Sequence, residues 1–506
     1  FDGVGDYTSI SNSQSYYFGT GDFTVEFWMY ITTAWTSNQG PGIGQKAGDS
    51  YGGWVIYRNN TVNTSYISIR LAGQSGAGQT DYATTVTPTQ NSWQHWAVVR
   101  SGTTLTWYCN GVSCGVTTGV STNITDTNTS GTMNIGRSQT WSTDFTGYLA
   151  DVRVVKGTAL YTSNFVPSIS TPLTNVTNTQ LLTLQTNGSH STSVIQDSST
   201  GQNLVTRNGD TNVGTFSPYG DNWSNYFNGT ADYLSSTVDP ISSANSTSDF
   251  TIEFWVYVTA TPSIRAFVYM TITTGTSYAI SLTSAANPQV SFWYTQYSTL
   301  LFTSAGTITQ NTWNHIAVTR QYSTSTVSIF INGTKDANTN NTVTTVGGCT
   351  TFRIGTYTGA NQYFPGYISN MRVVTSLVYT TNFTPSTTPL TAIPGTTLLT
   401  CQSNRFIDNS AINNALAVTG APQVQKFSPF STLTPYTRNY SVSFPATGSY
   451  ITATSTNFNV STTTSVFTLE FWVYPRANGY MCCIGNGGAY GDTIYTSYGN
   501  ITASKF

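Results

Sequence analysis

The residues best suited to chemistry in this sequence are its three glutamates, because each stands at the same place in a repeated stretch. Glu26 lies in DFTVEFWMY, Glu253 in DFTIEFWVY and Glu470 in FTLEFWVY. A carboxylate that occurs once per repeat and nowhere else indicates a specific task in catalysis, binding or architecture. Glycoside hydrolysis is the catalytic possibility, because carboxylates serve there as acid, base and nucleophile.

Glycoside hydrolysis needs a second carboxylate on the other side of the scissile bond. On a strand, the residues that share a face with Glu26 lie two and four positions away, and these are Trp28 and Tyr30. The other two copies also carry Trp and Tyr at these positions. The pattern therefore predicts that the protein is not an enzyme.

An architectural task for the glutamates is the prediction that the sequence favours. A carboxylate beside Trp and Tyr is costly unless it is paired and hydrogen-bonded. Two arginines recur at equivalent places in the repeats: Arg100 with Arg320, and Arg153 with Arg372. We expect Glu26 and Glu253 to pair with these arginines on neighbouring strands and so to fix strand register. A carboxylate that contacts a ligand is the alternative.

Histidines and cysteines do not form a metal-site pattern. His95 and His315 each stand alone on a strand face that carries Trp, which predicts a packed and hydrogen-bonded histidine rather than a metal ligand. The six cysteines do not recur at matching places, so no shared disulfide framework is predicted. Cys109 and Cys114 flank a hairpin turn, but that position does not imply a bridge.

Glycan binding is the binding function that the loops suggest. The stretches RSQTWSTDF and TYTGANQYF differ in sequence although the strands around them agree, as expected of a variable rim on a fixed scaffold. Aromatic rings stack on sugar faces. Trp141, Tyr357 and Tyr363 are therefore the candidate glycan-binding residues. The alternative is that they pack loops or contacts between repeats.

The elements that position these residues are predicted to be β-strands. Aromatic residues make up 14% of the chain, and hydrophobic residues alternate with a period of two in stretches such as DFTVEFWMY. Charged residues make up only 8% and the net charge is −2, so a nucleic-acid partner is not expected. The sequence contains no run of about 20 apolar residues, so no membrane span is predicted.

Internal repetition sets the domain organisation. Phe27 is equivalent to Phe254 and Leu181 to Leu398, so the repeat spans roughly 220 residues and should form a self-contained domain. Asn110-Gly111 and Asn332-Gly333 predict equivalent hairpins. Many short strands in a unit of this size predict a two-sheet jelly roll. We expect separate domains joined by the linkers PSISTPLTNVTNT and PSTTPLTAIPGTT.

The ordered motifs FDGVGDY, DFTVEFWMY, WQHWAVVR, YCNGV, IGR and GYLADVRVV resemble the laminin G-like branch of the concanavalin A-like lectin and glucanase superfamily. This resemblance implies an all-β fold of tandem jelly-roll β-sandwiches. The tails VVKGTALYTSNFVPS, LLTCQSNRFIDNS and VQKFSPF also resemble repeats in large virion proteins of marine bacteriophages. Related domains sometimes bind Ca²⁺ through Asp and Asn oxygens. Here no Asp-rich loop has ligand spacing, so no cofactor is predicted and Ca²⁺ is the open alternative.

The resemblance also sets the expected boundaries. Domains of this type begin with a strand like the one in LLTLQTNGSHSTSVIQDSSTGQNLVT. On that basis residues 1–174 form a jelly roll that lacks its first strand, residues 175–393 form a complete one, and residues 394–506 form the N-terminal part of a third. The chain is then expected to be a window from a longer array.

These features together predict a non-enzymatic adhesion or structural protein of a virion surface or the extracellular space. Its expected partners are host-surface glycans or other virion or surface proteins, within a larger oligomeric assembly. A secreted bacterial cell-surface adhesin and a structural spacer that binds no sugar are the alternatives.

Overall fold

The protein is described by a computed structural model, and its chain divides into two compact units, Phe1–Thr432 and Leu433–Phe506. The described residues are 1–34, 40–45, 47, 50–58, 66–125, 131–185, 195–211, 213, 216–220, 222–241, 248–260, 265–272, 276–285, 287–294, 299–340, 342–343, 349–357, 362–430, 479–484, 492–497 and 500–504. Helix among these residues is limited to three short 3-10 turns: η1 (Gln14–Tyr16), η2 (Gln74–Gly76) and η3 (Tyr322–Thr324). The predicted all-β fold class is confirmed. In the described part of the chain, no helix is long and apolar enough to cross a membrane.

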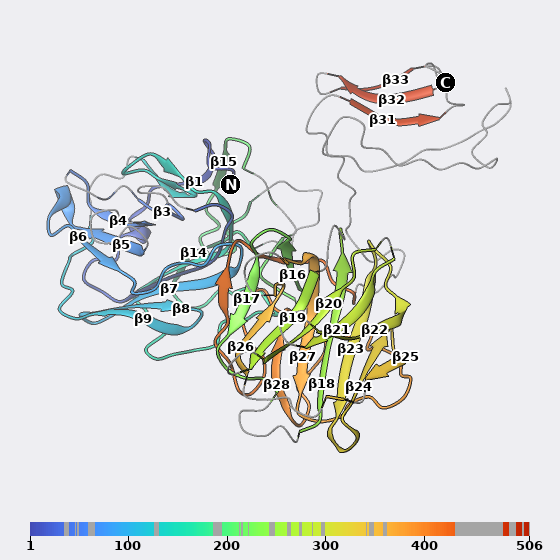
Figure 1. Ribbon diagram of the computed structural model, residues 1–506. Helices are drawn as coiled ribbons and strands as arrows, with labels where there is room; N and C mark the ends of the chain where they lie inside the picture. The colour runs from blue at the N-terminus through green and yellow to red at the C-terminus, as the bar shows by residue number, and fades with distance from the viewer. Residues whose placement is uncertain are drawn as a thin grey trace. The chain divides into compact units, whose positions relative to one another are not determined.

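The first repeat is a sandwich of two antiparallel sheets (Figure 1). The sheet that carries Glu26, here called the glutamate sheet, has the strand order β14 (Thr179–Thr183), β13 (Gly147–Lys156), β2 (Phe23–Ile31), β7 (Trp93–Ser101), β8 (Thr104–Cys109), β9 (Val112–Thr117). The opposite sheet has the order β15 (Val205–Asn208), β1 (Tyr7–Ser11), β10 (Thr132–Ile135), β3 (Ile43–Gly44), β4 (Gly53–Arg58), β5 (Ile67–Ala72), β6 (Thr80–Ala83). A short hairpin joins β11 (Arg137–Ser138) to β12 (Thr143–Asp144).

The second repeat has the same plan. Its glutamate sheet has the order β25 (Thr334–Asn340), β24 (Thr326–Ile331), β23 (Trp313–Gln321), β18 (Phe250–Val258), β27 (Pro365–Val374), β16 (Ser224–Asn228), β30 (Gln423–Gln425), and β28 (Thr396–Thr400) also pairs with β27. Its opposite sheet has the order β22 (Thr299–Thr307), β21 (Gln289–Tyr294), β20 (Thr276–Leu282), β19 (Arg265–Ile272), β26 (Cys349–Ile354), β17 (Tyr233–Ser236), β29 (Ala417–Thr419).

The second unit contains three described strands, β31 (Gly479–Ile484), β32 (Asp492–Ser497) and β33 (Asn500–Ser504), in one antiparallel sheet. The stretch that carries Glu470 lies outside the described residues.

Alternation along the strands decides which side chains form the core. In β2, Phe23, Val25 and Phe27 point between the two sheets and are completely buried there. Glu26 and Trp28 point to the outer face of the glutamate sheet, yet they are buried as well. The outer face is therefore covered by other parts of the chain.

The predicted domain boundaries are wrong at one point. The strand from the LLTLQTN stretch is β14, which pairs with β13, and β15 pairs with β1, so both strands complete the first repeat. In the second repeat β28 pairs with β27 and β29 pairs with β17 in the same way. Both edges that accept these strands belong to the preceding sandwich, so the segment closes one repeat instead of opening the next.

The predicted linkers are also wrong, because both stretches lie inside a repeat. Residues 167–179 run from the end of β13 toward β14, and Arg153 Nη1 donates a hydrogen bond of 2.7 Å to the carbonyl of Thr174. In the second repeat Arg372 Nη1 donates in the same way to the carbonyl of Thr391, at 2.8 Å. These stretches are therefore fixed parts of each sandwich.

The two repeats of the first unit share a hydrophobic cluster instead of standing as separate domains. Trp28, Tyr30 and Trp93 of the first repeat belong to the same buried cluster as the core of the second. Phe216, in the segment between the repeats, packs on Tyr30 with ring centroids 4.9 Å apart. Backbone hydrogen bonds also cross this junction, from Trp93 N–H to the carbonyl of Asn404 and from Val424 N–H to the carbonyl of Asn91.

Candidate functional site

Glu26 is fully buried and lies directly opposite Arg153 in the register of β2 and β13. Both Nε and Nη2 of Arg153 donate to Glu26 Oε1, at 2.8 and 2.5 Å. Two donors from one guanidinium fix the carboxylate in one orientation. The structure thus brings together Glu26 and Arg153, two of the residues that the sequence singled out for pairing.

The second carboxylate oxygen has two further partners. Glu26 Oε2 lies 3.1 Å from His95 Nε2 and accepts a hydrogen bond of 2.8 Å from the hydroxyl of Tyr161. Tyr161 comes from residues 157–168, here called the strap, which crosses the outer face of the glutamate sheet after β13. Phe165 of the strap stacks on Tyr161 at 3.6 Å, and its N–H donates to the carbonyl of Gly111.

The second repeat builds the same cluster on β18, β23 and β27. Arg372 Nε and Nη2 donate to Glu253 Oε1 at 2.9 and 2.5 Å. His315 Nε2 lies 3.2 Å from Glu253 Oε2, and the hydroxyl of Tyr379 donates to it at 2.8 Å. Tyr379 belongs to the equivalent strap, and it stacks on Phe383 at 3.6 Å. Each set of Glu, Arg, His and Tyr is called a glutamate cluster below.

Electrostatics keeps these carboxylates ionised although they are buried. Burial by itself raises the pKa of Glu26, but the hydrogen bond and charge of His95 and the charge of Arg153 outweigh it and hold the pKa below its usual value. The pKa of Glu253 is lowered by His315 and Arg372 against the same effect of burial. Burial and the nearby carboxylate raise the pKa of Tyr161, so its hydroxyl stays a donor.

Arg100 and Arg320 do not pair with the glutamates, and this part of the prediction is wrong. The Arg100 guanidinium donates to the carbonyls of Gly19, Gly21 and Thr122 and lies 5.2 Å from the centre of the Phe23 ring. Arg320 donates to the carbonyls of Ser248 and Val343. In β7, Arg100 has the same parity as Trp96 and Val98, so its side chain is on the core side of the sheet, away from Glu26.

The contacts of the glutamate cluster are those expected of an architectural task. Glu26 is sealed under the strap, and its described partners are an arginine, a histidine and a tyrosine rather than a second acid. Hydrolysis needs an open cleft between two carboxylates, which the surroundings of Glu26 do not provide. The sequence prediction missed Tyr161 and Tyr379, although the recurring ALYTSNF and LVYTTNF stretches marked both positions.

Trp141 lies in a cluster of polar and aromatic side chains outside the core of the first repeat. Its ring stacks on Tyr57 at 4.0 Å, and the Arg70 guanidinium carbon lies 4.8 Å from its centre. Arg70 Nε and Nη2 donate to Asp81 at 2.8 and 2.7 Å, and the Tyr57 hydroxyl donates to Asp81 at 2.9 Å. Trp141 is half-buried. Trp141, Tyr57, Arg70 and Asp81 are called the Trp141 platform below.

Tyr357 and Tyr363 are half-buried in the second repeat. Tyr357 contacts Tyr269 edge-on at 4.5 Å, and Tyr363 is roughly parallel to Tyr233 at 6.5 Å. The Arg353 guanidinium carbon lies 5.8 Å from the Tyr269 ring and 6.0 Å from the Tyr233 ring. The second repeat thus also places aromatic rings around an arginine, but its stacked pair is farther apart, at 6.5 Å, than the pair of the first repeat at 4.0 Å.

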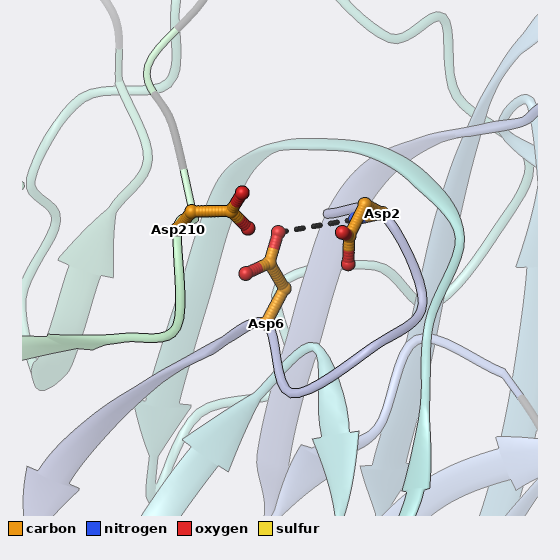
Figure 2. Close-up of side chains that lie close together, drawn as sticks. All are labelled: Asp2, Asp6 and Asp210. Carbon is orange, nitrogen blue, oxygen red and sulfur yellow. Dashed lines mark hydrogen bonds between the residues drawn. The ribbon is translucent and has the colours of Figure 1, made fainter. Parts of the chain in front are cut away.

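In the described part of the chain, the histidines and cysteines do not form a group that could hold a metal ion. His95 and His315 are buried and lie within hydrogen-bond distance of Glu26 and Glu253. Cys109, Cys114 and Cys401 are free thiols. The described residues hold one group of three acids, Asp2, Asp6 and Asp210 (Figure 2), which sequence spacing did not indicate because Asp210 is about two hundred residues from the others.

Comparison with protein families assigns the chain. Residues 2–161 and 228–378 each match the model of the concanavalin A-like lectin/glucanases superfamily. Together these segments are more than half of the chain, which therefore belongs to this superfamily. A search of curated proteins found no match.

Solved structures that match parts of this chain include laminin G domains and a pentraxin. Domains LG4-5 of the mouse laminin alpha1 chain share 11% identity and a TM-score of 0.27, with 75% of this chain and 92% of that chain covered. A SAP-like pentraxin from Limulus polyphemus shares 12% identity and a TM-score of 0.31, with coverage of 42% and 98%. The CBM40 domain of a Ruminococcus gnavus sialidase shares 15% identity and a TM-score of 0.23, with coverage of 26% and 79%. Nothing about ligands follows from similarities this distant.

Proposed function

We propose that this protein is a non-enzymatic adhesion protein of a virion or of the extracellular surface, and that it binds glycans through loops at the sandwich surface. The observation that carries the proposal is the Trp141 platform. Its geometry combines a half-buried tryptophan with charged groups that are already held in place.

Sugar recognition needs such a combination. A pyranose ring presents an apolar face that stacks on Trp, while its hydroxyl groups need donors and acceptors around the ring. Arg70 and Asp81 retain side-chain exposures of 14% and 13%, so both can serve as hydrogen-bond partners for sugar hydroxyl groups near the Trp141 ring. Tyr57 and Arg70 hold the indole in one orientation, which lowers the entropy cost of binding.

Repetition supports this proposal further. A single shallow aromatic site binds sugar weakly, but several sites on one array raise the overall affinity through effective concentration. Adhesion to a surface covered by repeating glycans needs this behaviour. The expected assembly is therefore a larger particle or surface structure that displays many copies of the chain.

The test is retention of the labelled chain on an array of cell-surface polysaccharides. We expect Trp141→Ala to weaken retention at least tenfold, because the stacking surface is lost. Tyr322→Ala is the control, since Tyr322 is a surface aromatic residue near an arginine but lies outside the Trp141 platform. Absence of any retained glycan, or equal retention by Trp141→Ala and the original chain, contradicts the proposal.

A structural spacer is the second candidate, and the junction between the repeats favours it. Shared packing of Trp28, Trp93 and Phe216, together with backbone hydrogen bonds across the junction, would make a stiff array. A spacer would bind no sugar and would still keep its repeats coupled. Imaging of the assembled particle would show whether the chain stands at the surface or bridges other components.

A further inference from the structure

Three aspartates of the first repeat meet at one edge of the opposite sheet. One carboxylate oxygen from each of Asp2, Asp6 and Asp210 lies within 4.8 Å of the others. Figure 2 shows Asp6 between the other two, with its carboxylate directed into the space that they share. Asp6 is only 3% exposed, whereas Asp2 and Asp210 are exposed. The group is therefore buried at Asp6 and exposed to solvent at Asp2 and Asp210.

Strand pairing brings these distant residues together. β1 and β15 are antiparallel neighbours, with Tyr7 opposite Asn208, so the loop before β1 meets the turn after β15. Gly209 in that turn has φ +65°, and a Cβ there would lie 2.5 Å from Asp6 Oδ1 and 2.6 Å from the carbonyl oxygen of Gly5. The backbone of the turn is thus packed directly against Asp6, which fixes the position of Asp210.

Asp6 has an oxygen that the protein does not satisfy. Its Oδ2 accepts a hydrogen bond of 3.1 Å from the N–H of Asp2. Its Oδ1 is buried and has no hydrogen-bond partner among the described residues. Among the described residues, none of the three aspartates forms an ion pair. Arg137 is paired with Asp144. The Phe1 ammonium feels the charges of all three aspartates, but it donates its hydrogen bond to the carbonyl of Gly147. A buried carboxyl oxygen without a donor points to a missing partner, which is either a cation or a proton shared with Asp210.

The second repeat shows which of these acids the fold itself needs. Asn228, Asp232 and Ala421 occupy the positions of Asp2, Asp6 and Asp210. Asn228 forms the same turn through its Oδ1, which accepts from the N–H of Thr230 at 2.8 Å, as Asp2 Oδ1 does from the N–H of Val4 at 2.7 Å. Only the buried aspartate is common to both repeats.

The buried aspartate also differs between the repeats in its hydrogen bonds. Asp232 Oδ1 accepts a hydrogen bond of 2.7 Å from the N–H of Ala421, and its Oδ2 accepts one of 3.0 Å from the N–H of Asn228. Asp6 has only the second of these bonds. The first repeat therefore carries two extra acids and lacks one hydrogen bond, which architecture alone does not explain.

We propose that Asp2, Asp6 and Asp210 bind a divalent cation of the calcium type, which joins the loop before β1 to the last strand of the first repeat. Carboxylate oxygens are the ligands that hard cations prefer. Ca²⁺ binds oxygen at about 2.3–2.6 Å, so two of its ligands can stand about 5 Å apart, whereas Mg²⁺ at about 2.0–2.1 Å limits this separation to about 4 Å. The three carboxylate oxygens lie within 4.8 Å of one another, a separation that the larger ion can bridge over its whole range. Water would complete the coordination of the ion on the solvent-exposed side of the group.

Without a cation, the three carboxylates should weaken the fold at neutral pH. Burial raises the pKa of Asp6. A proton shared with the Asp210 carboxyl and the charges of Asp2 and Asp210 raise it further, and the hydrogen bond from the Asp2 backbone opposes them. A carboxyl group whose pKa is raised by folding lowers stability as the pH rises above its ordinary value. A bound cation reverses this effect by favouring the ionised form.

The test uses the full chain after removal of metal with a chelator. Equilibrium dialysis with CaCl2 should show bound Ca²⁺, and the Asp2→Asn/Asp210→Ala double variant should bind one ion fewer per chain. Both substitutions place the residues of the second repeat at the same positions, so folding is preserved, and circular dichroism checks this. In chelator the double variant should melt at the same or a higher temperature than the original chain, and added CaCl2 should raise only the melting temperature of the original chain.

The reciprocal change strengthens the test. Asn228→Asp/Ala421→Asp installs the three acids in the second repeat and should add one bound Ca²⁺ per chain. Equal numbers of bound ions in the original chain and the Asp2→Asn/Asp210→Ala variant overturn the proposal. So does an original chain whose melting temperature depends on pH but not on CaCl2, because Asp6 and Asp210 would then only share a proton. Tighter binding of Mg²⁺ than of Ca²⁺ would overturn the choice of ion.

Discussion

At the scale of single residues, the glutamate cluster shows how an ionised group is kept inside a sandwich. Taking a carboxylate and a guanidinium out of water costs several kcal/mol per ion, which is recovered only when the geometry is good and the remaining hydrogen bonds are satisfied. Glu26 meets this condition through Arg153, His95 and Tyr161, which together reach both of its oxygens. We therefore propose that the pair specifies strand register and strap position.

Loss of the negative charge is expected to destabilise the first repeat strongly. Glu26→Gln leaves the Arg153 charge buried and unpaired, and this should lower the free energy of unfolding by about 3–5 kcal/mol. Because folding lowers the pKa of Glu26, its contribution is complete above the ordinary value of about 4.3 and is lost as the pH falls through the folded value. Calorimetry between pH 3 and 7 should show the difference between variant and original chain shrinking in acid.

Glu253→Gln is the matched variant in the second repeat and should behave in the same way. Replacement of both partners, as in Glu26→Leu/Arg153→Met, should cost much less than Glu26→Gln, because no charge is left unpaired. A glutamine variant as stable as the original chain at pH 7 would argue against the architectural task, and so would one that loses glycan retention without losing stability.

The sequence allowed the pairing of Glu26 to be predicted only in part. The period-two pattern placed Glu26 on the outer face, and a recurring arginine on a neighbouring strand followed from charge alone. The choice between Arg100 and Arg153 depends on strand parity, and Arg100 shares its parity with Trp96 and Val98. The Asp2, Asp6 and Asp210 group was not predictable, because it requires the pairing of β1 with a strand about two hundred residues later.

At the scale of elements, the strap explains why an outer strand face is buried. Thr24 Oγ1 accepts a hydrogen bond from Leu160 N–H and donates one to the carbonyl of Thr158. Asn164 Oδ1 accepts from the N–H of Ser113, just after the hairpin turn that contains Gly111. The strap is thus attached at both ends, with Tyr161 bonded to Glu26 between them.

The hairpin glycine is expected to be essential for strap attachment. Gly111 has φ +79°, and a Cβ there would lie 1.8 Å from the carbonyl oxygen of Phe165. Gly111→Ala should therefore force the strap away from the sheet, in addition to the strain of about 1–2 kcal/mol that a left-handed conformation imposes on alanine. Hydrogen exchange should show faster exchange of the strap amides, including those of Leu160 and Phe165.

Gly102→Ala separates the two effects. Gly102 has φ +59° in the preceding turn, but nothing lies within 4 Å of a Cβ placed there. Its substitution should bring only the backbone strain and leave exchange in the strap unchanged. Equal effects of the two substitutions would show that the contact between Gly111 and Phe165 does not hold the strap.

Strand assignment at the ends of each repeat could not be settled from sequence for a physical reason. In a jelly roll the first and last strands lie side by side, so a segment between two repeats has an edge available in either neighbour. Leu182 lies opposite Arg153 in the first repeat, and Leu399 lies opposite Arg372 in the second. The closing strand therefore backs the strand that bears the cluster arginine, a relation that motif order did not reveal.

At the scale of the whole first unit, the repeats are joined by an aromatic segment that contacts the outer face of the preceding glutamate sheet. Phe216 packs on Trp93 and Tyr148 of the first repeat. Phe427 packs in the same way on Trp313 and Tyr367 of the second. The residue three positions later then reaches the central Trp, as Tyr219 does with Trp28 and Phe430 with Trp255. Each repeat thus carries the same docking surface for the segment that follows it.

The two junctions differ in one polar contact, which makes the first one sensitive to pH. Asp151 Oδ2 accepts hydrogen bonds from the N–H of Leu173 and from the hydroxyl of Tyr219, while the second repeat has Asn370 and Phe430 at these positions. Burial raises the pKa of Asp151 to about 7. Because folding raises this pKa, the contribution of Asp151 is complete below the ordinary value of about 3.9 and declines as the pH rises to about 7.

Replacing this contact by its counterpart from the second repeat should remove the pH dependence. We expect the Asp151→Asn/Tyr219→Phe variant to have a melting temperature that changes less between pH 4 and 8 than that of the original chain, because no buried carboxyl is left to ionise at the junction. Tyr219→Phe alone should keep the dependence, since Asp151 then still has to ionise and has lost a donor. Calorimetry of all three chains across this range makes the comparison. An unchanged pH dependence in the double variant would mean that Asp151 does not ionise at the junction, and that packing of Phe216 and Trp28 alone couples the repeats.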